Sequence, residues 1–231
     1  MQFRSLIRIF AGKLIRIDHL KTFEELGVSE GIRRAIEEMG FVQPMPVQEE
    51  VIPYLLGNKN DVIALAQTGT GKTAAFGIPV LQRIAERPRP LLGEIGRGLP
   101  LALILAPTRE LCLQIADDMR DFAKYLDGIH IEAVYGGASI EQQIRALRKG
   151  VQVIVATPGR LIDLMKRGVA QLDDVRNVVL DEADEMLNMG FSESIDEILA
   201  GVPEDRNTLL FSATMSREIE RIAKGYLHDP K

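Results

Sequence analysis

The 231-residue sequence has no tryptophan, a single cysteine, three histidines and only 5% aromatic residues. The lone Cys112 excludes a disulfide-stapled scaffold and suits a reducing cytoplasm, where we expect the protein to act. No apolar run approaches the roughly 18–20 residues of a membrane span, so we expect no membrane partner. The shortage of aromatic rings argues against a platform that stacks the bases of single-stranded nucleic acid. The three histidines follow no metal-ligand spacing.

Charge and hydrophobicity are those of an ordinary globular protein, with 28 basic and 33 acidic residues, a net charge of −5 and 46% hydrophobic residues. These values exclude disordered and fibrous classes. The length is enough for one sizeable core, so we expect one α/β domain or two very small ones. The acidic balance argues against a protein that coats DNA, but it leaves room for a local basic surface.

The basic residues are concentrated at the start of the chain. Residues 1–17 carry Arg4, Arg8, Lys13 and Arg16 and no acid. These bases interrupt every apolar stretch, which excludes a secretory signal. We interpret residues 1–20 as a loosely ordered basic extension or the product of an upstream start codon, with a basic amphipathic helix on RNA or membrane as the alternative. Residues 21–231 then form the folded domain.

Short apolar runs alternate with helical patterns along the rest of the chain. Because such runs are apolar throughout, they predict strands buried on both faces of a parallel sheet. The expected fold is a doubly wound α/β domain, with a mostly parallel sheet and helices on both faces. Residues 88–100, rich in proline and glycine, predict a surface loop. The six predicted strands are Val62–Ala66, Leu101–Ala106, Ile131–Tyr135, Val151–Ala156, Val175–Leu180 and Thr208–Phe211.

The first predicted strand leads into a glycine-rich loop and then a helix. Glycines let the backbone N–H groups turn inward toward phosphate oxygens, and the following helix adds its positive N-terminal end. Lys72 is placed to reach the β- and γ-phosphates of a nucleotide, and the Thr73 hydroxyl to ligate Mg²⁺. The strict phosphate-loop pattern has glycine where this chain has Ala66. The predicted loop comprises Ala66, Gln67, Thr68, Gly69, Thr70, Gly71, Lys72 and Thr73.

A pair of carboxylates directly follows the predicted strand that ends at Leu180. Phosphoryl transfer to water requires a metal ion near the phosphates and a group that orients or deprotonates the water. Asp181 is placed to hold Mg²⁺, through water, and Glu182 to act on the water nucleophile. With Lys72, these two residues are the predicted catalytic set.

Six ordered motifs together resemble the first RecA-like domain of the DEAD-box RNA helicases. The resemblance covers about residues 21–231, and in this family alanine is the normal first residue of the phosphate loop. It implies a RecA-like P-loop NTPase domain that uses ATP and Mg²⁺, binds RNA and works with a second RecA-like domain of a longer chain. The motifs are AQTGTGKT at 66–73, PTREL at 107–111, GG at 136–137, TPGR at 157–160, DEAD at 181–184 and SAT at 212–214.

The resemblance also implies an adenine pocket upstream of the phosphate loop. Residues 40–48 are similar to the family's Gln motif, although Met45 stands where the family often has threonine. The Gln48 amide offers both a donor and an acceptor to the adenine edge. The residues alone would favour ordinary packing roles for both phenylalanines. The implied pocket comprises Phe23, which stacks on the base, with Phe41, Gln43 and Gln48.

The remaining strand ends resemble an RNA track made of exposed backbone, hydroxyl and guanidinium groups. Such groups suit phosphates and sugars, so we expect RNA binding that is independent of base sequence and sensitive to salt. Thr157 is placed to cap a helix while Arg160 points outward. The track comprises Pro107, Thr108, Arg109, Gly136, Gly137, Thr157, Pro158, Gly159 and Arg160.

In the family, the SAT strand lies beside the DEAD strand, and Ser212 and Thr214 resemble residues that bond to the DEAD carboxylates. This implies that they, with Asp184, couple ATP hydrolysis to strand separation. We therefore expect the N-terminal, ATP-binding half of a monomeric RNA helicase that unwinds short duplexes. The alternatives are a nucleotide-dependent RNA-binding scaffold without catalysis, or another kind of P-loop ATPase.

Overall fold

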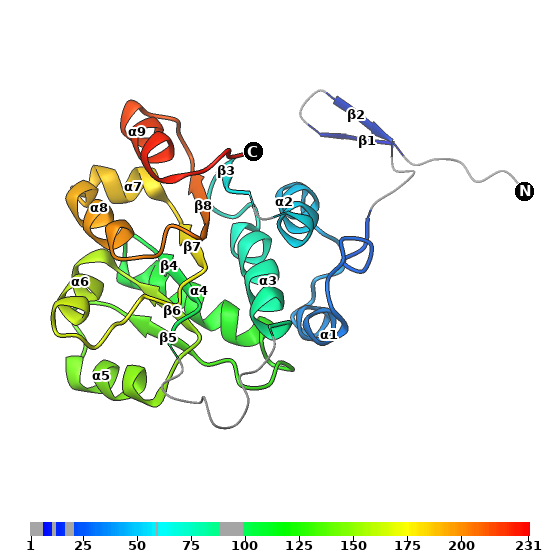
Figure 1. The fold of residues 1–231 in the computed structure, drawn as a ribbon. Helices are drawn as coiled ribbons and strands as arrows, with labels where there is room; N and C mark the ends of the chain where they lie inside the picture. The colour runs from blue at the N-terminus through cyan, green and yellow to red at the C-terminus, as the bar shows by residue number, and fades with distance from the viewer. Residues whose placement is uncertain (1–6, 11–12, 17–20, 59, 88–98) are drawn as a thin grey trace, which may run out of the picture.

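The computed structural model describes residues 7–10, 13–16, 21–58, 60–87 and 99–231. In this part of the chain, the centre of the molecule is a six-stranded sheet in which every neighbouring pair of strands is parallel (Figure 1). Its strands are β3 (Val62–Leu65), β4 (Ala102–Leu105), β5 (Ile131–Val134), β6 (Val153–Ala156), β7 (Asn177–Leu180) and β8 (Asn207–Ser212). Their order across the sheet is β3-β8-β7-β4-β6-β5.

The predicted strands and the doubly wound fold are confirmed, with strand ends that differ by one or two residues from those expected. Side chains alternate between two cores along each strand. In β4, Ile104 faces one core while Leu103 and Leu105 face the other, and all three are fully buried. This burial on both faces is the reason why the apolar runs show no polar alternation.

Helices cover both faces of the sheet, four on one side and five on the other among the described residues (Figure 1). Phe76 and Phe211 meet in the first core, with ring centroids 5.3 Å apart. The first layer is α1 (Glu30–Glu38), α2 (Pro46–Gly57), α3 (Lys72–Ala85) and α4 (Arg109–Phe122). The second is α5 (Ile140–Lys149), α6 (Pro158–Lys166), α7 (Ala183–Asn188), α8 (Ser192–Ala200) and α9 (Arg217–Tyr226).

The basic extension contains two short strands, β1 (Ile7–Phe10) and β2 (Lys13–Arg16), which pair antiparallel. The amphipathic helix considered as an alternative for this segment is therefore wrong for these residues. The rest of residues 1–20, and residues 88–98 of the predicted surface loop, lie outside the described residues.

Across the described residues, the helices are all too short or too polar to cross a membrane.

A buried carboxylate joins the start of β3 to distant parts of the chain. Asp61 is 1% exposed and accepts hydrogen bonds from the backbone N of Thr208 (2.6 Å), the Asn207 side chain (3.1 Å) and the backbone N of His228 (2.6 Å). Its own carbonyl accepts from the backbone N of Lys231 at 3.0 Å. Asp61 thus anchors the strand that leads into the glycine-rich loop to β8 and to the segment after α9.

Replacing Asp61 by alanine removes the carboxylate that accepts from the buried Thr208 N–H, from the Asn207 side chain and from the partly buried His228 N–H. A lost hydrogen bond costs about 1 kcal/mol, so we expect Asp61→Ala to lower the free energy of unfolding by about 2–3 kcal/mol. Urea denaturation followed by far-UV circular dichroism measures this change. The control Asp174→Ala removes an exposed carboxylate and should stay within about 0.5 kcal/mol of wild type. Equal stability of the two variants would contradict the anchoring role.

Candidate nucleotide site and strand-end surface

All six motifs lie just beyond the carboxyl ends of the six parallel strands, where ligands bind in open α/β sheets. Across the sheet they fall into two groups. The glycine-rich loop, SAT and DEAD follow the adjacent strands β3, β8 and β7. PTREL, TPGR and GG follow β4, β6 and β5, which complete the sheet. The loop, SAT and DEAD therefore occupy one half of this edge of the sheet, and the motifs expected to bind RNA occupy the adjoining half.

The glycine-rich loop connects β3 to α3 as predicted. Gly69 and Gly71 both have left-handed φ angles, +83° and +84°, which side-chain-bearing residues rarely adopt. The Thr70 hydroxyl donates to the carbonyl of Gln67 at 2.7 Å and closes the turn. Because α3 begins at Lys72, the positive end of this helix faces the loop.

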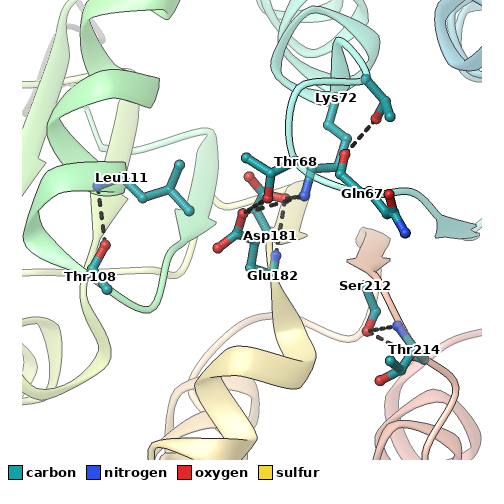
Figure 2. Close-up of polar contacts among 10 residues, drawn as sticks. Gln67, Thr68, Lys72, Thr108, Leu111, Asp181, Glu182, Ser212 and Thr214 are labelled. Carbon is teal, nitrogen blue, oxygen red and sulfur yellow. Dashed lines mark hydrogen bonds and ion pairs between the residues drawn. The ribbon is translucent and has the colours of Figure 1, made fainter.

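The three predicted catalytic residues come together at the base of this loop (Figure 2). The Lys72 amino group lies 3.3 Å from Asp181 Oδ1 and 3.7 Å from Glu182 Oε1. The Thr68 hydroxyl donates to Glu182 Oε1 at 2.9 Å, and the backbone N of Glu182 donates to Asp181 Oδ1 at 3.0 Å. The side chains of Lys72 and Asp181 are only 6% and 2% exposed.

Burial raises the pKa of Asp181, and the neighbouring Lys72 ammonium opposes this rise only in part. A buried carboxylate next to a second carboxylate needs a cation to stay charged, and Lys72 supplies it here. Glu182 has a left-handed backbone conformation (φ 51°, ψ 49°), which costs a non-glycine residue of order 1–3 kcal/mol. In this backbone conformation, the Glu182 side chain lies beside Thr68 and Lys72.

A cavity of about 600 Å³ extends from this cluster to the predicted adenine pocket. Phe41, Gln43 and Gln48 line it, together with Lys72, Thr73, Asp181 and Glu182. Phe23 is not among the lining residues; it is 6% exposed and stacks behind Phe41 with ring centroids 6.3 Å apart. Contact between Phe23 and a base stays a prediction.

Gln48 connects the start of α2 to the glycine-rich loop. Its side-chain oxygen accepts from the backbone N of Met45 at 2.9 Å, and its NH₂ group donates to the carbonyl of Gly71 at 3.1 Å. An amide group has two donor hydrogens and two acceptor lone pairs, so one of each remains for a ligand. The contact through the Met45 backbone does not require the family's usual threonine side chain.

SAT and DEAD are in direct contact, since β7 and β8 are neighbours in the sheet as expected. The Thr214 hydroxyl donates to Asp184 Oδ2 at 3.1 Å, and Ser212 and Thr214 are joined by a hydrogen bond from Ser212 Oγ to the Thr214 carbonyl at 2.7 Å. Partial burial would raise the pKa of Asp184, but the hydrogen bonds from Thr214, Ala213 and Ser212 outweigh it and lower the pKa.

The predicted RNA-track residues line the other half of the sheet edge. Thr108 caps α4 by accepting from the backbone N of Leu111 at 3.2 Å, and the Arg109 guanidinium lies 5.1 Å from the ring centre of Tyr135. Thr157 precedes α6 without capping it through its side chain. Arg160 does not point outward as expected.

Instead, the Arg160 side chain contacts the turn between β5 and α5 and the first part of α5. It donates to the Ala138 carbonyl at 3.2 Å and to Gln143 at 3.0 Å. These contacts tie TPGR to the turn that carries Gly136 and Gly137. Pro107, Pro158 and Gly159 lie in the same row of strand ends, with Pro158 buried and Gly159 exposed.

Two polar residues that line the cavity lie outside all the motifs. Gln114 and Asp118 project from α4, on the face that also carries Leu111 and Phe122. They follow Leu111 by three and seven residues, which places them on the same face of the helix. This spacing alone does not indicate what that face contacts. Only the packing of α4 beside α3 shows that it borders the cavity.

The oxygen ligands near the loop fit Mg²⁺ bound together with a nucleotide. Mg²⁺ prefers oxygen ligands and is bound in such sites by one or two carboxylates or hydroxyls plus substrate phosphates. Thr73 and Asp181 both line the cavity and supply such oxygens. Within the described residues, no group of three or more histidine, cysteine or acidic side chains forms a self-sufficient metal cage. The donor set therefore fits a metal ion that arrives with phosphates.

The chain belongs to the DEAD/DEAH box helicase family, whose match covers residues 45–222. It is 48% identical over 210 residues to the "ATP-dependent RNA helicase DeaD" of Buchnera aphidicola, covering 91% of this chain and 33% of that protein. It is 49% identical over 212 residues to the "DEAD-box ATP-dependent RNA helicase CshA" of Geobacillus kaustophilus, covering 92% of this chain and 43% of that protein. The chain thus spans between a third and a half of the length of these relatives.

Two crystal structures of DEAD-box proteins share the fold. One is a DEAD box protein from the hyperthermophile Methanococcus jannaschii, with a TM-score of 0.80 and 41% identity over 91% of this chain and 55% of the other. The second is the yeast splicing factor Prp28, with a TM-score of 0.83 and 38% identity over 91% of this chain and 50% of the other. The RecA-like fold predicted from the motifs is confirmed.

The two left-handed glycines of the loop provide a matched pair of variants. A Cβ on Gly71 would lie 2.5 Å from Gln48 Nε2 and 2.9 Å from Met45 Sδ, whereas a Cβ on Gly69 would meet nothing within 4 Å. Both alanine variants incur a backbone penalty of about 1–2 kcal/mol. We expect Gly71→Ala to lower the free energy of unfolding by at least 1 kcal/mol more than Gly69→Ala. Urea denaturation distinguishes them, and equal losses would contradict the close packing of Gln48 on Gly71.

Proposed function

We propose that this chain is the ATP-binding half of an RNA helicase that binds ATP with Mg²⁺ and the sugar-phosphate backbone of RNA. With a second RecA-like domain, it hydrolyses ATP and unwinds short duplexes. The observation that carries the proposal is the convergence of Lys72, Asp181 and Glu182 beneath a glycine-rich loop with two left-handed glycines. The family membership supports the same reaction.

The residues of the cluster have separate roles in this proposal. Lys72 leaves its two carboxylate partners to neutralise the β- and γ-phosphates, which the loop N–H groups and the start of α3 also contact. Thr73, and Asp181 through water, would hold Mg²⁺, and the ion would supply positive charge against the negative charge that develops on the phosphates. Glu182 orients the attacking water and accepts its proton. Gln48 selects adenine through its remaining donor and acceptor, with Phe23, Phe41 and Gln43 around the base.

RNA occupies the half of the sheet edge formed by the ends of β4, β6 and β5. Arg109 provides positive charge there, and the backbone and hydroxyl groups of PTREL, GG and TPGR contact phosphates and sugars without reading bases. Arg160 contributes by holding the turn after β5 in place. Within the other half, the contact between Thr214 and Asp184 links SAT to DEAD, so a change at the DEAD strand on hydrolysis is transmitted to the SAT strand. A cytoplasmic location and a monomeric state remain expectations from the sequence.

Nucleotide binding can be tested on the chain itself. We expect ATP with Mg²⁺ at a hundred times its dissociation constant to stabilise the chain by about 2.7 kcal/mol, and GTP to stabilise it less. Lys72→Ala removes a charged contact and should weaken ATP binding about 10- to 100-fold, as measured by isothermal titration calorimetry. The exposed Lys149→Ala is the charge-matched control. Circular dichroism verifies folding, and unchanged ATP affinity of folded Lys72→Ala would contradict the proposed site.

Turnover tests the need for a second domain. Arginine fingers supplied from another domain contribute about 10³–10⁵ in related phosphoryl transfers, so we expect the 231-residue chain to hydrolyse ATP very slowly, with or without RNA. Joined to the second RecA-like domain of its full-length protein, it should show RNA-stimulated hydrolysis that Glu182→Gln abolishes without loss of ATP binding. Turnover in the Glu182→Gln protein would favour a role other than catalysis for this carboxylate.

A further inference from the structure

The cavity has a polar wall that the proposed mechanism does not use. Helix α4 lines it with Leu111, Gln114, Asp118 and Phe122, which share one helical face. Leu111 and Phe122 are apolar, but Gln114 is an exposed amide and Asp118 a half-buried carboxylate. Within the described part of the chain, neither polar side chain has a hydrogen-bond partner.

The position of Asp118 along α4 places it toward the base end of the cavity. Phe122, one turn further on, packs edge-on against Phe41 with ring centroids 6.1 Å apart, and Phe41 belongs to the predicted adenine pocket. At 1.5 Å per residue, Asp118 lies about 6 Å along the helix from Phe122 and about 10 Å from Leu111. Lys72 and the glycine-rich loop line the other end of the cavity. Asp118 is therefore placed beside the nucleoside part of a nucleotide and away from its phosphates.

The chemistry of Asp118 restricts what it can contact. An ionised carboxylate only accepts hydrogen bonds, and it repels phosphate oxygens. Burial raises the pKa of Asp118, and the like charges of Asp121 and Asp117 raise it further, so a hydrogen-bond donor in the cavity would relieve an unfavourable environment. The neutral donors on the nucleoside half of ATP are the amino group of the base and the hydroxyls of the ribose.

We propose that Asp118 is a specificity-determining residue of the nucleotide site, which accepts a hydrogen bond from a neutral donor on the nucleoside half of ATP. Gln114, one turn nearer the phosphates, borders the same contact. This inference rests on the proposed binding of ATP. It adds a carboxylate on α4 to the recognition supplied by the residues around Gln48.

A double-mutant cycle between protein and nucleotide tests this contact. The dissociation constants of ATP, inosine triphosphate, 2′-deoxy-ATP and 3′-deoxy-ATP are measured by isothermal titration calorimetry for wild type, Asp118→Ala and Asp118→Asn. The control Asp121→Ala removes the same charge from an exposed position on the same helix. Because the lost hydrogen bond is to a charged group, we expect Asp118→Ala to bind ATP about tenfold more weakly than wild type. Asp118→Asn should lose less affinity, and the control should change the dissociation constant less than twofold.

The cycle also identifies the donor. Wild type should bind the analogue that lacks it at least tenfold less well than it binds ATP, and this ratio should be about tenfold smaller in Asp118→Ala, because the partner is already lost. The inference is wrong if Asp118→Ala binds ATP as tightly as wild type does. It is also wrong if the affinities of Asp118→Ala for the analogues, relative to ATP, all equal those of wild type. In both cases the proposed binding of ATP is unaffected. If wild type binds no ATP, the proposed function and this inference fail together.

Discussion

The buried ion pair between Lys72 and Asp181 is the interaction on which the arrangement of the site depends. Lys72 starts the helix after β3, Asp181 directly follows β7, and β8 lies between these two strands in the sheet. The pair therefore crosses the end of β8, where SAT is located. A buried carboxylate without a cation would be costly, so the loop, the DEAD strand and the SAT strand are held in one arrangement. The hydrogen bond from the Gln48 side chain to Gly71 is a second link, between α2 and the loop.

This arrangement connects stability with function. Two features of the site cost free energy: the left-handed backbone of Glu182, and the two neighbouring carboxylates beside Lys72. The packing of the parallel sheet offsets this cost. At the opposite end of the strands, Asp61 fastens β3 to β8 and to the residues near Lys231. The strand that presents the glycine-rich loop is thus fixed at its start by buried hydrogen bonds and at its end by an ion pair.

Much of the fold was predictable from short stretches of sequence. A strand that is buried on both faces must be apolar along its whole length, and residues 103–105 are an example. Several contacts between distant residues were not predictable from local patterns. Nothing in the TPGR motif shows that Arg160 bonds to Ala138, and Gln114 and Asp118 appear as ordinary residues of an amphipathic helix. Nor does the sequence around Phe23 show that its ring packs on that of Phe41. Such outcomes depend on which elements meet, and local sequence patterns do not encode that.

By itself, the sequence determined the strands, the six motifs and their position at strand ends, because periodicity and glycine, proline and acidic residues act over a few neighbours. Only the tertiary structure decided which motifs are neighbours. Along the chain, the three motifs of the proposed RNA track separate the glycine-rich loop from DEAD and SAT, but the strand order β3-β8-β7-β4-β6-β5 brings the loop, SAT and DEAD together as one group beside the other. Crossover connections can return a strand to any position in a parallel sheet, and the burial of both sheet faces selects the order that packs.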